Sequence, residues 1–151
     1  MSRKEKKVIQ KEKATPQKKP IVVETPEDFY DKVPSWSFKM MDNGYVKWGL
    51  CHANDLYNKV IKKLVDFEGM TWGEIIKATG GRNHRNNNHY ENVSDLTLEA
   101  QKRWKDLKLE EYDRVFSLRL SGKERLYGIL LSGIFRIIWY DSEHEIYPID
   151  K

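Results

Sequence analysis

The feature that most constrains the fold is a set of three short segments near the C-terminus in which apolar and polar residues alternate. These segments span 116–120, 126–131 and 135–139, and turns of only a few residues separate them. A repeat of two residues is typical of strands, and short turns join antiparallel neighbours. The pattern therefore predicts an antiparallel meander of three strands, or four if Ile146 and Tyr147 begin another.

Apolar residues recur at helical spacing in the region before the meander. From residue 56 to residue 64, every fourth residue is apolar, which gives one apolar face of a helix. Thr71 and Glu74 match a capping box at the start of a second helix, and Ser94 is expected to cap a third. The predicted helices span 54–68, 72–79 and 95–108.

The N-terminal part of the domain has a strand signal of its own. Trp36 and Phe38 alternate with polar residues, and a second apolar run at 45–50 follows Asn43-Gly44. An Asn-Gly pair between two apolar runs predicts a hairpin. The expected fold is therefore α+β, with an N-terminal strand or hairpin and two to three helices packed on one face of a three- to four-stranded antiparallel meander.

The alternation in the meander also predicts which side chains are buried. Phe116 and Phe135 are expected on the face that the helices cover, and Arg119 and Arg136 on the opposite face. The predicted buried set is Trp104, Phe116, Leu118, Phe135, Ile137 and Trp139.

Positive charge is concentrated at the N-terminus. Residues 1–19 contain eight Lys or Arg and two Glu, a net charge of +6, whereas the whole chain carries +4 and the remainder about −2. This balance argues against a general nucleic-acid-binding domain. We expect a disordered basic tail at 1–19, a linker at 20–34 and a single domain at 35–151. The tail either attracts an anionic partner or is only a solvated end.

Cysteine usage and hydropathy indicate the compartment. The single cysteine, Cys51, cannot form an internal disulfide, and no apolar run has the length of a membrane span. The lysines near the N-terminus are not followed by the apolar stretch of a secretory signal. We therefore expect a cytoplasmic protein with no membrane partner, in which Cys51 is a small buried side chain.

Five basic residues in the region of the meander are candidates for a phosphate site: Arg119, Lys123, Arg125, Arg136 and His144. Adjacent strands lie about 4.8 Å apart and long basic side chains reach further, so these groups can converge on one face. The alternative is that they are the solvated face of an ordinary sheet, paired with nearby acidic residues.

Two stretches of this region carry a family resemblance. Residues 120–129 (LSGKERLYGI) and 139–144 (WYDSEH), together with the β, α, α, β, β, β order, resemble the RelE/ParE-like toxins of bacterial type II toxin-antitoxin systems. The similarity lies within residues 115–147. It implies a RelE-like fold and a small endoribonuclease acting on free or ribosome-bound mRNA, or a gyrase inhibitor, neutralised by a cognate antitoxin protein.

The ribonuclease implied by this resemblance would use the 2′-hydroxyl of the RNA itself and would need no metal or other cofactor. The lysine and the three arginines named above would clamp the phosphate. His144 would act as acid or base, because the ordinary pKa of histidine lies near the working pH.

The chain departs from this family in an extra helix after Ser94, an asparagine-rich loop at 82–92 and the basic tail. These differences leave open a second function, a non-catalytic module on the same fold that recognises RNA or a protein. His52, His84 and His89 are weak metal candidates, because no cysteine or carboxylate stands at ligand spacing.

Overall fold

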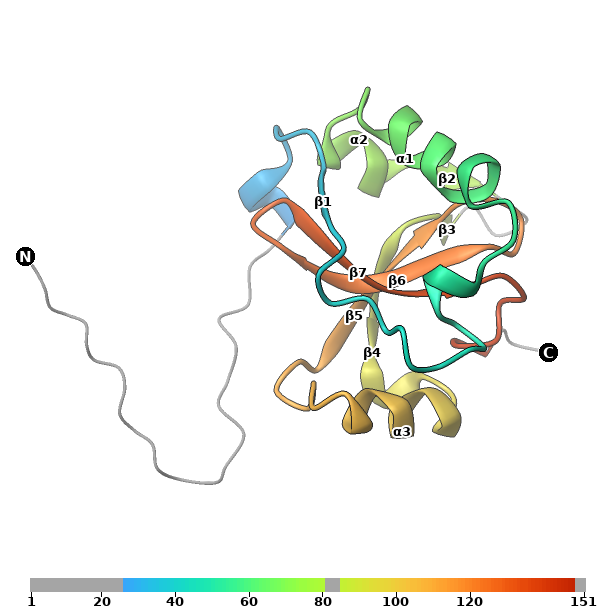
Figure 1. Ribbon diagram of the computed structural model, residues 1–151. Coiled ribbons are helices and arrows are strands. Elements are labelled where there is room, and N and C mark those ends of the chain that lie inside the picture. Colours follow the sequence, from blue (N-terminus) through green and yellow to red (C-terminus); the bar gives the residue numbers. More distant parts are fainter. Residues whose placement is uncertain (1–25, 81–84, 149–151) are drawn as a thin grey trace, which may run out of the picture.

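The computed structural model describes residues 26–80 and 85–148, which form an α+β fold (Figure 1). The predicted tail and the first part of the predicted linker lie outside the described residues. The helices are α1 (Lys62–Phe67), α2 (Trp72–Lys77) and α3 (Leu98–Asp106). The strands are β1 (Ser35–Ser37), β2 (Thr79–Gly80), β3 (Arg85–Asn86), β4 (His89–Asn92), β5 (Arg114–Arg119), β6 (Arg125–Leu131) and β7 (Ile134–Asp141).

The main sheet has the strand order β1-β7-β6-β5-β4. Strands β5, β6 and β7 form the predicted antiparallel meander. Two further strands change the expected architecture, since β1 pairs with β7 in parallel and β4 pairs with the other edge of the meander at β5. The sheet is therefore five-stranded and mixed, in place of the three to four antiparallel strands that the sequence predicted.

Of the predicted N-terminal strand or hairpin, the strand forms as β1 and the hairpin does not. After β1 the chain continues as a connecting segment, residues 38–56, that follows the edge of β7. The backbone amide of Asp42 donates to the carbonyl of Ile138 at 3.0 Å, and that of Tyr140 donates to the carbonyl of Trp48 at 2.9 Å. Backbone groups of β7 that β1 does not reach are therefore hydrogen-bonded to the connecting segment, and this part of the strand is not an open sheet edge.

Strand β4 arises from a stretch whose polar composition predicted a loop. The ring of Tyr90 packs on that of Phe116, with centroids 5.1 Å apart. Just before the strand, the side chain of Asn88 is buried, donates to the carbonyl of Ile75 at 3.0 Å and accepts from the backbone amide of Arg119 at 2.7 Å. Because both ends of this buried amide are hydrogen-bonded, it fixes β4 to α2 and β5.

Helices cover both faces of the sheet, which corrects the prediction of a single covered face. Figure 1 shows α1 and α2 on one side of the sheet and α3 on the other. Phe116 and Phe135 share the core beneath α1 and α2, with ring centroids 5.6 Å apart, so their common face is confirmed. On the other face, Trp104 of α3 packs on Trp139 at 5.6 Å in a second core.

A β-bulge explains why Trp139 lies on the face opposite Ile137. Tyr127 pairs with Trp139 whereas Gly128 pairs with Ile137, so Ile138 is an extra residue in β7. One extra residue reverses the alternation of side chains from that point onward. The six side chains predicted to be buried are all 2% exposed or less, but they belong to two cores.

Helices α1 and α2 lie close to their predicted positions. A π-helical turn, Tyr57–Ile61, leads into α1. The hydroxyl of Thr71 accepts from the amide of Glu74 at 3.2 Å, and the carboxylate of Glu74 accepts from the amide of Thr71 at 3.0 Å. The predicted capping box is therefore confirmed.

Two local predictions are wrong. Ser94 does not cap α3, because the chain forms a 3-10 turn there and the hydroxyl of Thr97 accepts from the amide of Ala100 at 3.3 Å. Cys51 is exposed rather than buried. It lies in a short 3-10 turn of the connecting segment, where only Leu50 points into the core.

Candidate functional site

The candidate site is a row of side chains on the α3-facing side of the sheet, at the end near the β5–β6 turn. In the strand register, Arg119 of β5 stands opposite Arg125 of β6, and Arg125 stands opposite Asp141 of β7. Like charges directly across a strand pair are destabilising. The repulsion between the two arginines must therefore be offset by hydrogen-bond acceptors or by a negative charge.

The two guanidinium groups meet at one backbone oxygen. Arg119 Nε and Arg125 Nη1 each donate to the carbonyl of Ser121 at 3.0 Å, so these nitrogens are at most twice that distance apart. Arg119 also donates to Asn87 Oδ1 at 2.8 Å. All of these acceptors are neutral, and in residues 26–80 and 85–148 neither arginine forms an ion pair with a carboxylate. The balancing charge nearest to Arg125 is the buried carboxylate of Asp141 across the strand pair, which acts on the guanidinium through its field and not through a direct ion pair.

The nearby carboxylate of Asp141 is used to hold a loop. Asp141 is fully buried, and its Oδ2 accepts from the backbone amides of Glu145 and Ile146, each at 2.7 Å. These bonds fold residues 142–146 back over the end of β7, so the predicted fourth strand at Ile146 does not form. The same loop carries His144, which has a φ of 60° and lies close enough to Arg125 for the guanidinium charge to act on the imidazole.

Burial and neighbouring charges set the protonation of Arg125 and His144. Burial lowers the pKa of Arg125, and the neighbouring Arg119 lowers it further. Burial also lowers the pKa of His144, and the charge of Arg125 adds to that shift. The His144 imidazole is therefore neutral at pH 7, while the guanidinium of Arg125 remains charged. Within the described residues, His144 Nδ1 is buried without a hydrogen-bond partner. We call Arg119, Arg125 and His144 the arginine–histidine cluster.

The adjoining row supplies groups that sequence reasoning missed. Ser117 and Tyr127 are cross-strand partners on the same face, and both are buried. Burial raises the pKa of Tyr127, and the charge of Asp141 raises it further, so the phenol is protonated and hydrogen-bonds to Ser117. On the edge strand β4, His89 Nδ1 lies 2.9 Å from a carboxylate oxygen of Glu91. Ser117 lies two residues before Arg119 in β5, so the alternation of side chains along the strand could have predicted that both lie on the same face.

Lys123 and Arg136 are not part of the cluster. Lys123 pairs with the carboxylate of Glu143 at 2.8 Å in an exposed position. Arg136 stands opposite Ile129, four residues along β6 from Arg125, which is about 13 Å at strand spacing. The structure therefore brings together three of the five predicted site residues.

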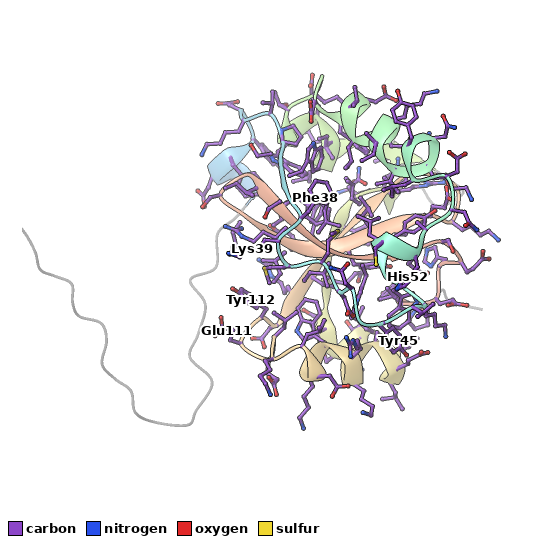
Figure 2. All side chains as sticks on the ribbon, in the orientation of Figure 1. Phe38, Lys39, Tyr45, His52, Glu111 and Tyr112 are labelled. Atoms are coloured by element: carbon purple, nitrogen blue, oxygen red, sulfur yellow. The ribbon has the colours of Figure 1, made fainter. Side chains whose placement is uncertain are left out.

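A cleft of about 530 Å³ lies on the other side of the β5–β6 turn. The connecting segment forms one wall, and Figure 2 shows its course in front of the sheet, from Phe38 and Lys39 to His52. The lining is mostly polar and includes Lys47, Lys59 and Lys123. We call this cavity the lysine cleft.

The described residues give no support to a metal site or a membrane-spanning helix. Residues 26–80 and 85–148 contain no group of three His, Cys, Asp or Glu side chains placed to hold a metal ion. His52 lies on the connecting segment and His89 on β4, whereas His84 is outside the described residues. In the same part of the chain, no helix is long and apolar enough to cross a bilayer.

Comparison with protein-family models, with curated proteins and with solved structures finds no match to this chain. Function is therefore argued from the chemistry of the cluster and the cleft.

Proposed function

We propose that the arginine–histidine cluster binds a phosphate of RNA, and that the protein is a metal-independent endoribonuclease of the toxin type. The observation that supports this proposal is the pair of guanidinium groups at one carbonyl, without a carboxylate partner in the described residues. Two like charges held together are relieved when an anion binds to both. The oxygens of a phosphodiester match such a pair of donors.

The proposed reaction uses the RNA's own 2′-oxygen as the nucleophile. Neutral His144 accepts the 2′-hydroxyl proton, a bond forms between the 2′-oxygen and phosphorus, and the bond from phosphorus to the 5′-oxygen breaks. The leaving 5′-oxygen takes a proton from water, and the hydroxide that remains takes the proton held by His144, which returns the imidazole to its neutral form. Arg119 and Arg125 stabilise the charge that develops on the non-bridging oxygens. The products are a 2′,3′-cyclic phosphate and a 5′-hydroxyl end.

The biological part of the proposal rests on the resemblance of residues 120–129 and 139–144 to RelE/ParE-like toxins. It places the substrate as mRNA in the cytoplasm, free or bound to the ribosome. It also includes a cognate antitoxin protein that blocks the cluster. Reading the neighbouring gene tests this part, since a small adjacent gene for a DNA-binding protein is expected.

A second candidate function is a non-catalytic module that binds RNA or a protein. One observation favours it: Tyr127, next to the cluster, is buried and burial raises its pKa, so the phenol holds its proton and is a poor acid for the leaving oxygen. Under this alternative the guanidinium pair binds phosphate and the RNA stays intact.

The deciding experiment is incubation of the purified protein with a labelled single-stranded RNA. Cleavage with 2′,3′-cyclic phosphate ends is expected from the wild type. We expect an Arg125→Gln, His144→Asn double variant to lose at least 100-fold in rate, in line with the loss of a general base and an electrostatic donor. Growth arrest on induced expression should follow the same order.

Arg136→Gln is the matched control, because it removes the same charge from the same face of the sheet at a distance from the cluster. It should cleave at the wild-type rate. RNA binding without cleavage by the wild type would favour the non-catalytic module. Equal cleavage by the wild type and the double variant would overturn the assignment of the cluster.

A further inference from the structure

The lysine cleft shares a wall with the arginine–histidine cluster. Arg119 and Arg125 both donate hydrogen bonds to the carbonyl of Ser121 in the β5–β6 turn, residues 120–124. Ser121 and Lys123 of the same turn line the cleft. A chain that lies across the turn therefore reaches both places.

Three lysines from separate parts of the fold line the cleft, beside Glu124 and Glu143. Lys47 comes from the connecting segment, Lys59 from the π-helical turn before α1, and Lys123 from the β5–β6 turn. Lys47 is paired with Glu99 at 2.9 Å and with Glu145 at 3.7 Å, which leaves the other two lysines as the candidates for a phosphate. In the described residues Lys59 forms no ion pair. Lys123 is paired with Glu143, but both side chains are more than half exposed, at 64% and 58%. Exposed pairs contribute little to stability, so a phosphate can displace this carboxylate.

One carboxylate in the cleft has a different role. Glu124 accepts from the hydroxyl of Tyr140 at 2.7 Å and from that of Ser121 at 2.8 Å. Burial alone would raise the pKa of Glu124, but these hydrogen bonds, together with the charges of Lys59 and Lys63, outweigh it and the pKa is lowered. The group stays ionised and keeps free lone pairs, so it can accept hydrogen bonds from a ligand.

Ammonium groups beside a fixed carboxylate suit a nucleotide better than a simple anion. The lysines match the phosphate, and the carboxylate of Glu124 matches the N–H donors of a base or the hydroxyls of a ribose. The volume of about 530 Å³ lies in the range of small-molecule sites. A base can enter such a cleft only when it is not stacked in a duplex.

We propose that the lysine cleft binds an unpaired nucleotide of the RNA, next to the phosphate held by the arginine–histidine cluster. This inference rests on the proposed RNA substrate. It makes the cleft a second contact on a single strand, with Lys59 and Lys123 at a phosphate and Glu124 at the base or ribose of the same nucleotide.

The test measures binding of three probes: inorganic phosphate, nucleoside 5′-monophosphates, and a 2′-O-methyl single-stranded RNA that cannot be cleaved by its own 2′-oxygen. A Lys59→Ala, Lys123→Ala double variant should weaken binding of the RNA and the monophosphates about 10-fold or more. Its salt dependence should be reduced by about one phosphate contact. Glu124→Gln should weaken the monophosphates and leave inorganic phosphate unchanged.

The control is Lys105→Ala, which removes an exposed charge from α3 and should bind all three probes like the wild type. Unfolding curves of each variant confirm that it is folded. Loss of binding in the lysine variant would support the cleft even if the wild type does not cleave RNA. Cleavage that depends on Arg125, with RNA binding unchanged in the lysine variant, would overturn the cleft and leave the proposed function standing. Absence of binding of every probe by the wild type would also overturn it.

Discussion

Asp42 and Arg103, which are 61 positions apart in the chain, form a two-point ion pair that ties the connecting segment to α3. The distances are 2.8 Å from Arg103 Nε to one carboxylate oxygen and 2.7 Å from Nη2 to the other. Trp139 of β7 donates its indole N–H to the same carboxylate at 2.9 Å. The side chain of Asp42 is 1% exposed. The connecting segment, α3 and β7 are therefore joined at one buried carboxylate.

Replacing Asp42 with alanine is expected to lower the free energy of unfolding by about 3 kcal/mol or more, because it leaves the Arg103 guanidinium without its partner. Urea denaturation measures this. Asp106→Ala is the control, since its pair with Lys102 lies on the surface of the same helix. That substitution should cost about 1 kcal/mol or less. Equal losses in the two variants would show that the buried pair has no special weight.

The same carboxylate predicts a loss of stability in acid. Burial tends to raise the pKa of Asp42, but the hydrogen bonds from Arg103 and Trp139 and the charge of Arg103 outweigh it, so the pKa lies below the ordinary value. A lowered folded-state pKa adds stability that is present above the unfolded-state pKa, about 3.9, and is lost as the pH falls through the folded-state pKa. The stability difference between the wild type and Asp42→Asn should therefore shrink below about pH 4 in urea titrations.

Gly128, at the β-bulge, is expected to tolerate no side chain. A Cβ built there would lie 2.0 Å from the backbone oxygen of Arg136, which cannot move without breaking the strand pairing. Gly128→Ala should lower the free energy of unfolding by about 3 kcal/mol. Gly122→Ala is the control, because nothing lies within 4 Å of its Cβ position. A wild-type melting temperature for Gly128→Ala would contradict the bulge.

Local patterns predicted the meander, because alternation and short turns act between neighbours in the chain. The parallel pairing of β1 with β7 and the addition of β4 depend on residues far apart in sequence. The bulge at Ile138 leaves no composition signal, and it moves Trp139 to the second core. For this reason both faces of the sheet are covered, although the sequence predicted one.

The candidate site shows the same limit. Arg119, Arg125 and His144 come together because two face each other across a strand pair and the third lies in the loop after β7. Arg136 has the right parity for that face, but parity does not fix the distance along a strand. Lys123 lies in the β5–β6 turn, next to the cluster, but its side chain lines the lysine cleft on the other side of that turn.

Arg125→Gln is expected to leave stability unchanged or to raise the free energy of unfolding by up to about 1 kcal/mol at low salt, since it relieves repulsion from Arg119. Functional sites often hold such destabilising charges. Urea denaturation at two salt concentrations measures the effect, which should diminish as salt screens the pair. A loss of more than about 2 kcal/mol would indicate that the bonds of Arg125 to the β5–β6 turn are structural.

The protonation of His144 should respond to the same substitution. Burial and the charge of Arg125 both lower the pKa of His144, so Arg125→Gln removes one of the two causes and the pKa should rise towards its ordinary value. Titration of the imidazole signal by NMR measures this directly, with His144→Asn to assign the signal. Because a base must be neutral, the acidic limb of RNA cleavage should have its midpoint below about pH 6.5 in the wild type and should move to higher pH with the measured pKa. Arg136→Gln, at the far end of the same face, should leave the titration unchanged. An unaltered His144 titration in Arg125→Gln would show that the two side chains do not act as one cluster.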